Sequence, residues 1–557
     1  MTGNEGLHLF DRIKNTLNFF FKYFFLSFTL IVYFEPVRAE SELDNFSLKL
    51  SIYQNSKNNR FLKKFYLERN YSPIFVTKVN EGRASALLMA LESAHYHGIP
   101  SALYKLNEIR YDIKKLRSKT ELGALEVKLA KNFILYVKHM KSGVLDPEVI
   151  NDKLIENATL IDDVKIPKQL DLKLKKIDLA SIFLTFLETK PVTFFKQIQP
   201  QSSDYGSLVR EKKNLEQTLK LGGWGEKITA SILRLGDKGE EVVKLRNRLI
   251  RMGLMEKSYS PIYDKKLKLS VKKFQMLHGL IEDGVAGEVT LYEINKSIKD
   301  RLKLLIASLE RRRWLNGAYE DKYLVVNIPE FKLRIIEKGK TIYQSKVVVG
   351  QDRPNTRTPE FSNKLQFMVI NPSWYVPRSI ILEEYLPDIR KNINAASELF
   401  FTDKSGNYIA REDINFDVLI DEDFPYGMKQ PPSNDNALGA VKFMLPNIHN
   451  IYLHDTPDKN LFSEEVRAFS HGCVRVYQPF ELAYELLSVN FNNPKVVFDN
   501  LLKNEVEFKL NLRKQIPVHI TYSTVWSNNG EEVSYRRDIY GRDIEIYKSL
   551  QDLGLSL

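Results

Sequence analysis

The sequence predicts a multidomain α+β protein: a helical scaffold, a compact three-helix domain and a mostly-β domain with a partly helical capping insertion. With 557 residues, the chain is too long for one hydrophobic core. Its first half has apolar residues at helical spacing, whereas alternating branched and polar residues dominate after residue 320. The predicted domains are a signal peptide or N-terminal anchor (1–39), a helical scaffold (40–230), the three-helix domain (231–298), a helical linker (299–320), the mostly-β domain (321–505, with the insertion at about 377–432) and a C-terminal β-hairpin extension (506–557).

The composition indicates folded, soluble domains, because 43% hydrophobic and 27% charged residues are near the averages of globular proteins. The formal net charge is +12. This excess favours polyanionic partners, such as nucleic acid, an anionic membrane surface or the acidic polymers of a bacterial wall. Charge alone does not select among them.

The first 39 residues have the pattern of an export signal. Three positive charges and one negative charge in residues 11–22 precede Tyr23 to Phe34, an uncharged apolar run of 12 residues. A spanning helix needs about 20 residues, whereas Val37-Arg38-Ala39 fits the small-residue pattern of a cleavage site. We predict cleavage after Ala39. The alternative is an uncleaved anchor over Leu17 to Phe34.

The scaffold and the three-helix domain are predicted from periodicity and from helix ends. In residues 83–98, "RASALLMALESAHYHG", four apolar side chains lie on one helical face and Gly98 ends the helix. Residues 232–298 contain three helical patterns, of which the third begins near Glu288 or Thr290. The predicted N-caps of the first two are Asp237 and Asp264, and their predicted stops are Gly253 and Gly279.

Strand patterns follow "RRRW" at 311–314. Residues 323–350 alternate branched and polar side chains, with a hairpin turn predicted at Glu337 to Lys340. The segment between Pro377 and Pro432 interrupts this pattern, so we predict an insertion that caps an active site. Near the C-terminus, Asn529-Gly530 predicts a second hairpin turn.

The only cysteine of the chain lies in "SHGCVR", residues 470–475. An oxidising compartment pairs thiols where a partner exists, so an unpaired Cys473 in an exported chain is either a buried structural residue or a reactive group. A catalytic thiol needs a base, an environment that lowers its pKa and donors for the oxyanion that forms when it attacks a carbonyl.

Candidates for these roles lie nearby. His471 precedes Cys473 by two residues, and His454 precedes it by 19 residues at the end of a predicted strand. Spacing does not distinguish the two histidines as the base. Gly472 permits a tight turn, so the amides of Gly472 and Cys473 could face a substrate carbonyl. Arg475 could bind a carboxylate through its guanidinium.

Several motifs resemble known families. "LGDKG", "FQ", "HGL" and "DGVAG" resemble the small three-helix peptidoglycan-binding domain, and "IYLHDTP" followed by "SHGCVRV" resembles the YkuD-type L,D-transpeptidase catalytic domain. In that family the histidine of the earlier strand is the usual base, which points to His454. "NPSWYVPRSI", "DNALGAVKFMLPN" and "RDIYG" are similar to the large multidomain, YcbB-like branch. That branch often has Ser-Ser-Gly-Cys where this chain has a histidine at position 471.

The resemblance implies a periplasmic enzyme. Cys473 would attack the diaminopimelate carbonyl of a tetrapeptide stem, release D-alanine and pass the acyl group to an amine, giving a 3-3 crosslink. His454 would be the base and the Gly472 amide an oxyanion donor. The resemblance also implies acylation by carbapenems. The predicted substrate-binding residues are Arg475, Ser470, His471, Tyr452 and Trp374.

The expected partners are peptidoglycan stem peptides, as donors and acceptors, and wall-anchored outer-membrane proteins. We expect no cofactor, no metal and no nucleic acid. Four alternatives remain open: a metal site, a cysteine hydrolase of stems, a transpeptidase that attaches proteins to the wall, and a non-enzymatic wall-binding protein. The ligands of the metal alternative would be His449, His454, His471 and Cys473. The acceptor amine, from a second stem, a free D-amino acid or a protein, also stays open.

Overall fold

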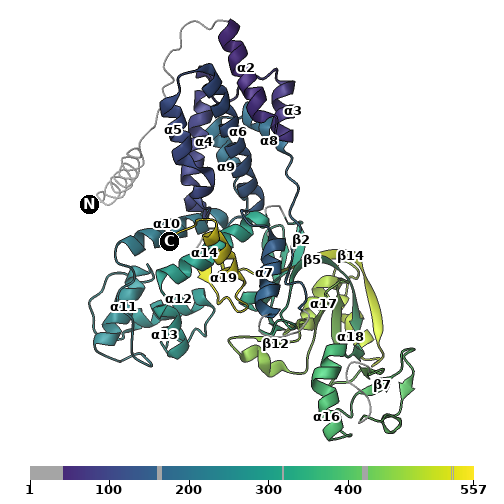
Figure 1. Cartoon of the computed structure of the whole chain (residues 1–557). Coiled ribbons are helices and arrows are strands. Elements are labelled where there is room, and N and C mark those ends of the chain that lie inside the picture. The colour runs from purple at the N-terminus through teal and green to yellow at the C-terminus, as the bar shows by residue number, and fades with distance from the viewer. Residues whose placement is uncertain (1–41, 160–165, 316–318, 417–423, 528–529, 531) are drawn as a thin grey trace, which may run out of the picture. The chain divides into compact units, whose positions relative to one another are not determined.

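The structure, a computed structural model, describes residues 42–159, 166–315, 319–416, 424–527, 530 and 532–557 (Figure 1). The predicted export signal lies outside these ranges. The chain divides into two compact units: the first contains the residues up to His95, Ile99–Lys141 and Lys176–Gln199, and the second contains Tyr96–Gly98, Ser142–Lys175 and Pro200–Leu557. Within the described ranges, no helix combines the length and apolar character that crossing a membrane requires.

The first unit is helical, which confirms the predicted scaffold. Phe133 lies at the centre of its core, within 6.2 Å of the rings of Phe183, Phe194 and Phe195. The helix expected in 83–98 is present: α4 continues into a 3-10 turn, and Gly98 has a positive φ of 69°. The helices are α2 (Glu42–Ser56), α3 (Arg60–Glu68), α4 (Glu81–Ser93), α5 (Leu106–Lys115), α6 (Lys119–Ser142), α8 (Leu179–Glu188) and α9 (Pro191–Gln197).

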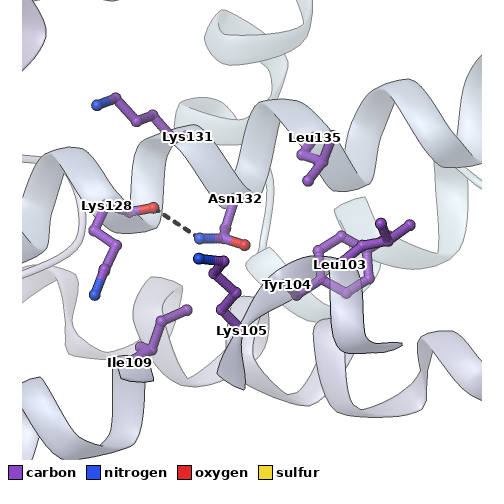
Figure 2. A pocket seen from close by; sticks show the side chains of 8 residues that line it. All are labelled: Leu103, Tyr104, Lys105, Ile109, Lys128, Lys131, Asn132 and Leu135. Atoms are coloured by element: carbon purple, nitrogen blue, oxygen red, sulfur yellow. Dashed lines mark hydrogen bonds between the residues drawn. The ribbon is translucent and has the colours of Figure 1, made fainter. Parts of the chain in front are cut away.

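A cavity of about 140 Å³ lies beside α6 in this unit, as Figure 2 shows. Lys105, Lys128 and Lys131 line it together with apolar side chains. Lys128 pairs with Asp112 at 2.5 Å. None of the predicted site residues lines this cavity.

The three-helix domain consists of α11 (Glu240–Arg251), α12 (Lys265–His278) and α13 (Glu288–Asn295) around one apolar core. The Asp264 carboxylate accepts from the Leu267 N–H at 2.8 Å, and Gly279 is left-handed, so both predicted ends of α12 are confirmed. The prediction that Asp237 caps α11 is wrong. Gly239 is the N-cap, because Asp237 accepts from the Arg234 N–H at 2.8 Å and so closes the preceding turn.

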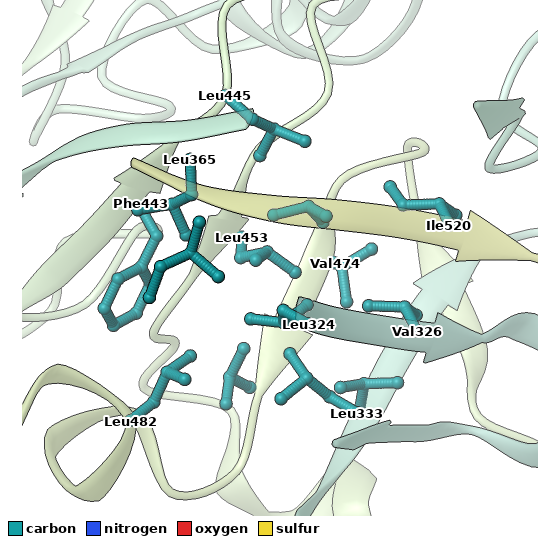
Figure 3. Close-up of a cluster of buried hydrophobic side chains, with 14 of the residues drawn as sticks. Leu324, Val326, Leu333, Leu365, Phe443, Leu445, Leu453, Val474, Leu482 and Ile520 are labelled. Carbon is teal, nitrogen blue, oxygen red and sulfur yellow. The ribbon is translucent and has the colours of Figure 1, made fainter. Parts of the chain in front are cut away.

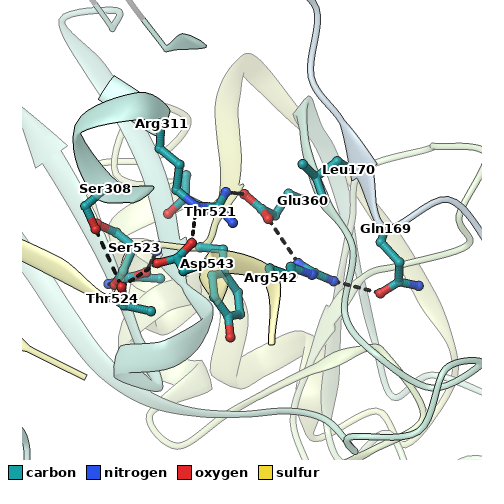
Figure 4. Close-up of polar contacts among 12 residues, drawn as sticks. Gln169, Leu170, Ser308, Arg311, Glu360, Thr521, Ser523, Thr524, Arg542 and Asp543 are labelled. Atoms are coloured by element: carbon teal, nitrogen blue, oxygen red, sulfur yellow. Dashed lines mark hydrogen bonds and ion pairs between the residues drawn. The ribbon is translucent and has the colours of Figure 1, made fainter. Parts of the chain in front are cut away.

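Residues 299–320, expected to be a linker, supply most of α14 (Ile298–Trp314), a helix that is buried along its length. It contacts α10 (Tyr205–Lys220) and α19 (Arg542–Asp552), and α19 also contacts α7 (Pro147–Thr159). A charge-balanced group of two arginines and two carboxylates lies here (Figure 4). Arg311 contacts Glu360 at 2.7 Å and Asp543 at 2.6 Å, and Arg542 contacts Glu360 at 3.2 Å.

The mostly-β domain has a ten-stranded sheet in the order β1-β5-β10-β11-β13-β4-β3-β2-β14, with β12 beside β4. Because β14 also pairs with β5, the sheet closes on itself around an apolar core (Figure 3). The strands are β1 (Leu170–Asp171), β2 (Lys322–Asn327), β3 (Lys332–Glu337), β4 (Lys340–Gly350), β5 (Glu360–Ile370), β10 (Val441–Met444), β11 (Leu453–His454), β12 (Ala468–Ser470), β13 (Val474–Val476) and β14 (Phe508–Thr521). Helices α17 (Pro479–Leu487) and α18 (Pro494–Leu502) separate β13 from β14.

The turn predicted at Glu337 to Lys340 is confirmed, since these two residues pair and Lys338 and Gly339 both have positive φ. Residues 506–557, predicted as an extension, supply β14 to the main sheet. The C-terminal hairpin itself is present as β15 (Val525–Ser527) and β16 (Val533–Tyr535). Of its predicted turn, Asn529 lies outside the described residues.

The insertion between β5 and β10 has its own sheet, in the order β6-β9-β7-β8, and its own apolar core. Its strands are β6 (Trp374–Tyr375), β7 (Phe400–Thr402), β8 (Tyr408–Ile409) and β9 (Gly427–Gln430). Its helical part runs through α15 (Arg378–Ile380), the π-helical turn η5 (Ile381–Tyr385) and α16 (Leu386–Lys391). The segment is therefore partly helical, as predicted.

Candidate active site

Two short parallel strands bring four of the predicted residues together. In the β11–β13 pair, Leu453 lies opposite Val474 and His454 opposite Arg475. Leu453 and Val474 are fully buried in the apolar core. Because successive side chains of a strand point to opposite faces, the other face carries four neighbouring polar or reactive side chains. We call it the site face; its residues are Tyr452, His454, Cys473 and Arg475.

Residues 470–473, here called the nucleophile loop, form a turn between β12 and β13. Gly472 has a φ of 113°, and a side chain there would meet the Ile451 side chain at 3.1 Å. The Ser470 hydroxyl donates to the Cys473 carbonyl at 2.5 Å and accepts from the Gly472 N–H at 3.2 Å. The Gly472 N–H, predicted as an oxyanion donor, thus donates to Ser470 Oγ in the resting protein, and its role as an oxyanion donor stays a prediction.

Burial raises the pKa of the Cys473 thiol to about 11, although the hydrogen bonds from Tyr452 and the charge of Arg475 act in the opposite direction. This shift is opposite to the one expected for a thiol that rests as a thiolate. The thiol itself contacts the Asn450 carbonyl, with Sγ 3.7 Å from the oxygen. At neutral pH the Cys473 thiol is therefore protonated in the resting protein.

His454 is 5% exposed, and its Nδ1 lies 2.5 Å from the Asp455 carbonyl oxygen. Since a carbonyl only accepts, Nδ1 carries the proton and Nε2 is left as a proton acceptor. Burial, together with the nearby charges of Arg475, Lys442 and Lys459, lowers the pKa of His454 to about 3, although the hydrogen bond to the Asp455 carbonyl acts in the opposite direction. The resting pair at pH 7 is thus a thiol and a neutral imidazole.

The protonated thiol of Cys473 predicts how its rate of alkylation depends on pH. We expect the rate at which iodoacetamide modifies Cys473 to rise about tenfold per pH unit between pH 7 and pH 10, because the thiolate fraction grows in that proportion below the pKa. Intact-mass spectrometry measures it cleanly, since the chain has one cysteine. A Cys473→Ser variant is the unreactive control. A rate that levels off below pH 8 would show a thiolate–imidazolium pair instead.

Arg475 gives the site face its positive charge. Its Nη1 lies 2.8 Å from Asp458 Oδ2, and its side chain is 19% exposed. Its Nε is buried and has no hydrogen-bond partner within the described part of the chain. Lys442 and Lys459 add positive charge around His454. The site face therefore suits a substrate that carries carboxylates.

The two remaining predicted residues lie elsewhere. His471 points to the insertion, where its Nε2 lies 2.5 Å from Glu384 Oε1 in η5. This contact joins the nucleophile loop to the insertion. Trp374 is 9% exposed and packs in the core of the insertion, near Tyr385. Trp374, which was predicted to contact substrate, is buried among the apolar side chains of the insertion, and a contact with substrate stays a prediction.

The residues of the metal alternative have separate partners. His449 Nε2 lies 3.3 Å from Asp171 Oδ2, whereas His471 contacts Glu384 and His454 the Asp455 carbonyl. Across the described ranges, no three histidine, cysteine, aspartate or glutamate side chains are grouped so as to hold a metal ion.

Sequence reasoning missed Thr358, which contacts the nucleophile loop. Its Oγ1 donates to the Gly472 carbonyl at 2.7 Å. The two residues are 114 positions apart, and no motif quoted from the sequence includes Thr358. Asn450, which contacts Cys473, and Glu384, which contacts His471, were also missed. Each of these contacts depends on the fold rather than on a local pattern.

Three segments match protein families. Residues 321–508 match "L,D-transpeptidase catalytic domain" (YkuD), residues 60–211 match "Scaffold domain", and residues 238–294 match "Putative peptidoglycan binding domain". The site face lies inside the first of these segments.

The chain is similar to a curated protein of Haemophilus influenzae named "Putative L,D-transpeptidase", with 36% identity over 225 residues. The match covers 40% of this chain and 45% of that protein, so it spans less than half of the relative's length. Among solved structures, an L,D-transpeptidase from Mycobacterium smegmatis matches with 11% identity over 36% of this chain and 58% of its own, at a TM-score of 0.17. One from Stackebrandtia nassauensis matches with 14% identity over 53% and 97%, at a TM-score of 0.20. Because these TM-scores are low, the similarity of the chain to L,D-transpeptidases rests on the family matches and the curated relative.

Proposed function

We propose that the chain, whose residues 321–508 match the L,D-transpeptidase catalytic domain (YkuD), is a cysteine acyltransferase that crosslinks the stem peptides of peptidoglycan. One observation carries the proposal: the only cysteine of the chain lies on the same face of two paired strands as His454 and Arg475. A nucleophile, a proton acceptor and a carboxylate-binding cation are the groups that this reaction needs.

In the first half-reaction, Cys473 Sγ attacks the diaminopimelate carbonyl of a tetrapeptide stem, and the thiol proton passes to His454 Nε2. Because the resting thiol and imidazole are both neutral, we expect this transfer to accompany formation of the C–S bond. The tetrahedral oxyanion then collapses, the C–N bond breaks, and the proton on His454 leaves with the amine of D-alanine. A thioester on Cys473 remains.

In the second half-reaction, an acceptor amine attacks the thioester carbonyl. His454 takes a proton from the amine and returns it to the Cys473 sulfur as the C–S bond breaks. If the amine belongs to the diaminopimelate of a second stem, the product is a 3-3 crosslink. A neutral His454 is suited to both transfers, because it can accept a proton in each half-reaction.

Mass spectrometry of the protein incubated with a purified tetrapeptide stem tests this function. We expect an acyl adduct on Cys473 that has lost D-alanine, and a dimer with the mass of two stems less one D-alanine. Tripeptide and D-alanine without dimer would identify a hydrolase, since water and amine compete for one thioester. An adduct on any other residue, or no release of D-alanine, would contradict the proposal.

Arg475 is proposed to bind a carboxylate of the donor stem. We expect Arg475→Gln to raise the KM for the donor roughly 10- to 100-fold with a smaller change in kcat, because a hydrogen bond to a charged group contributes about 1.5–3 kcal/mol. Steady-state release of D-alanine measures it. Arg475→Lys keeps the charge and should lie between the two. An unchanged KM in Arg475→Gln would assign Arg475 to the Asp458 ion pair alone.

The proposal places the enzyme outside the cytoplasm, in the periplasm, with residues 1–39 as the export signal or anchor. The peptidoglycan-binding domain at 238–294 would hold the enzyme on its polymeric substrate. We also propose that carbapenems acylate Cys473, since a thiol that attacks a stem carbonyl can attack a β-lactam carbonyl. Attachment of outer-membrane proteins differs only in the acceptor amine.

A further inference from the structure

Among the described residues, one backbone group of Gly472 and Cys473 has no hydrogen-bond partner, the N–H of Cys473. The Gly472 N–H donates to Ser470 Oγ, and the Gly472 carbonyl accepts from Thr358 Oγ1. The Cys473 carbonyl accepts from Ser470 Oγ. For the Cys473 N–H, the described part of the chain supplies no acceptor. A nucleophile's own N–H is a familiar oxyanion donor in acyl transfer.

The hydroxyl of Thr358 has its direction fixed by its surroundings. Thr358 is fully buried, and its Oγ1 accepts from the Gly350 N–H at 2.9 Å. A hydroxyl has one proton, so the Thr358 proton is available only for the Gly472 carbonyl, 2.7 Å away. The backbone of Thr358 is held as well, because its carbonyl accepts from Arg542 Nη2 at 2.9 Å.

Through the peptide bond between Gly472 and Cys473, the contact with Thr358 also determines the direction of the Cys473 N–H. In a planar trans peptide, the carbonyl of one residue and the N–H of the next point in opposite directions. A Gly472 carbonyl held on Thr358 therefore aims the Cys473 N–H away from Thr358. We infer that Thr358 is a positioning residue, which aims the Cys473 N–H as the oxyanion donor of the acyl transfer. This inference rests on the proposed function.

The expected effect follows from what an oxyanion donor contributes. Loss of one donor lowers kcat by about 10²- to 10³-fold. In Thr358→Val the Cys473 N–H is present but free to rotate away, so we expect a loss of about 10- to 100-fold in the rate of acylation by tetrapeptide stem, with little change in KM. Thr358→Ser retains the hydroxyl and should acylate within about threefold of the unsubstituted protein.

Two reactions of the Cys473 thiol show whether Thr358→Val misaims the Cys473 N–H or disturbs the whole site. Attack on a carbonyl creates an oxyanion, whereas alkylation by iodoacetamide creates none. We expect Thr358→Val to slow acylation and to leave the alkylation rate within about twofold of the unsubstituted protein, because only the first reaction uses the oxyanion donor. Equal losses in both reactions, or full acylation by Thr358→Val, would overturn the inference.

The single cysteine gives a second test that needs no substitution. Protein labelled with ¹⁵N-cysteine has one labelled amide, that of Cys473. We expect its resonance to shift when a carbapenem acylates the thiol and the acyl carbonyl oxygen accepts from this N–H. A resonance that does not move on acylation would overturn the inference. If the unsubstituted protein is not acylated by tetrapeptide, the proposed function fails instead.

Discussion

Cys473→Ala is expected to abolish release of D-alanine from a tetrapeptide stem, with a loss of more than about 10³-fold, because no other thiol can form the acyl-enzyme. The change removes one sulfur atom from a loop that other contacts hold. Ser470 bonds backbone atoms of the loop, and Thr358 bonds the Gly472 carbonyl. The loop should therefore keep its conformation, so the loss of D-alanine release should come from the missing thiol rather than from misfolding.

Binding to purified peptidoglycan is the control for this variant. The three-helix domain has its own apolar core, formed by α11, α12 and α13. We expect Cys473→Ala to sediment with peptidoglycan as the unsubstituted protein does, while crosslinked dimers are missing from the products. Normal release of D-alanine by Cys473→Ala would contradict the proposed nucleophile. Loss of both binding and activity would show that the variant is misfolded.

Glu360→Ala is expected to lower the free energy of unfolding by about 3–5 kcal/mol, the usual cost of removing one partner from a buried ion pair. Glu360 contacts both Arg311 and Arg542, and all three side chains are at most 3% exposed. Without Glu360, Arg311 keeps the Asp543 carboxylate, whereas Arg542 loses its only carboxylate partner in this group. Urea denaturation, followed by tryptophan fluorescence, measures the change.

The exposed pair of Asp388 and Lys391 supplies the matched control. Its side chains are 68% and 76% exposed, and its atoms lie 3.1 Å apart. We expect Asp388→Asn to change the free energy of unfolding by less than about 1 kcal/mol, because water solvates both charges. Equal effects of the two substitutions would mean that burial does not determine the strength of these ion pairs.

Local sequence patterns predicted elements well and partners poorly. The spacing of Asp264 and Gly279 predicted both ends of α12, since helix caps depend on the residues within one turn. Alternation also indicates that β14 is a strand, but it does not say which strand lies beside it. Its pairing with β5 joins residues such as Val518 and Asn363, which are far apart in the chain. Alternation therefore did not predict that β14 joins the main sheet.

For the candidate site too, local patterns indicated residues but not their partners in the fold. Cys473 and His454 have recognisable neighbours along the chain, so the sequence pointed to both, and the pairing of β11 with β13 brings them to one face. The hydrogen bond from the Gly472 N–H to Ser470 Oγ could not be predicted, because it depends on side-chain geometry. The direction of the thiol pKa also needed the fold, since burial dominates over the charge of Arg475. Thr358 could not be found, because its contact depends on tertiary structure alone.

The high pKa of Cys473 also bears on oxidative damage. Peroxides react with the thiolate, and a thiol with a pKa of about 11 is roughly 10⁻⁴ ionised at pH 7. The chain has no second cysteine that could convert a sulfenic acid into a disulfide and so open a route to repair. In the proposed function, burial makes Cys473 depend on His454 for activation. The same burial keeps the thiol protonated, so a cysteine without a resolving partner is slow to oxidise.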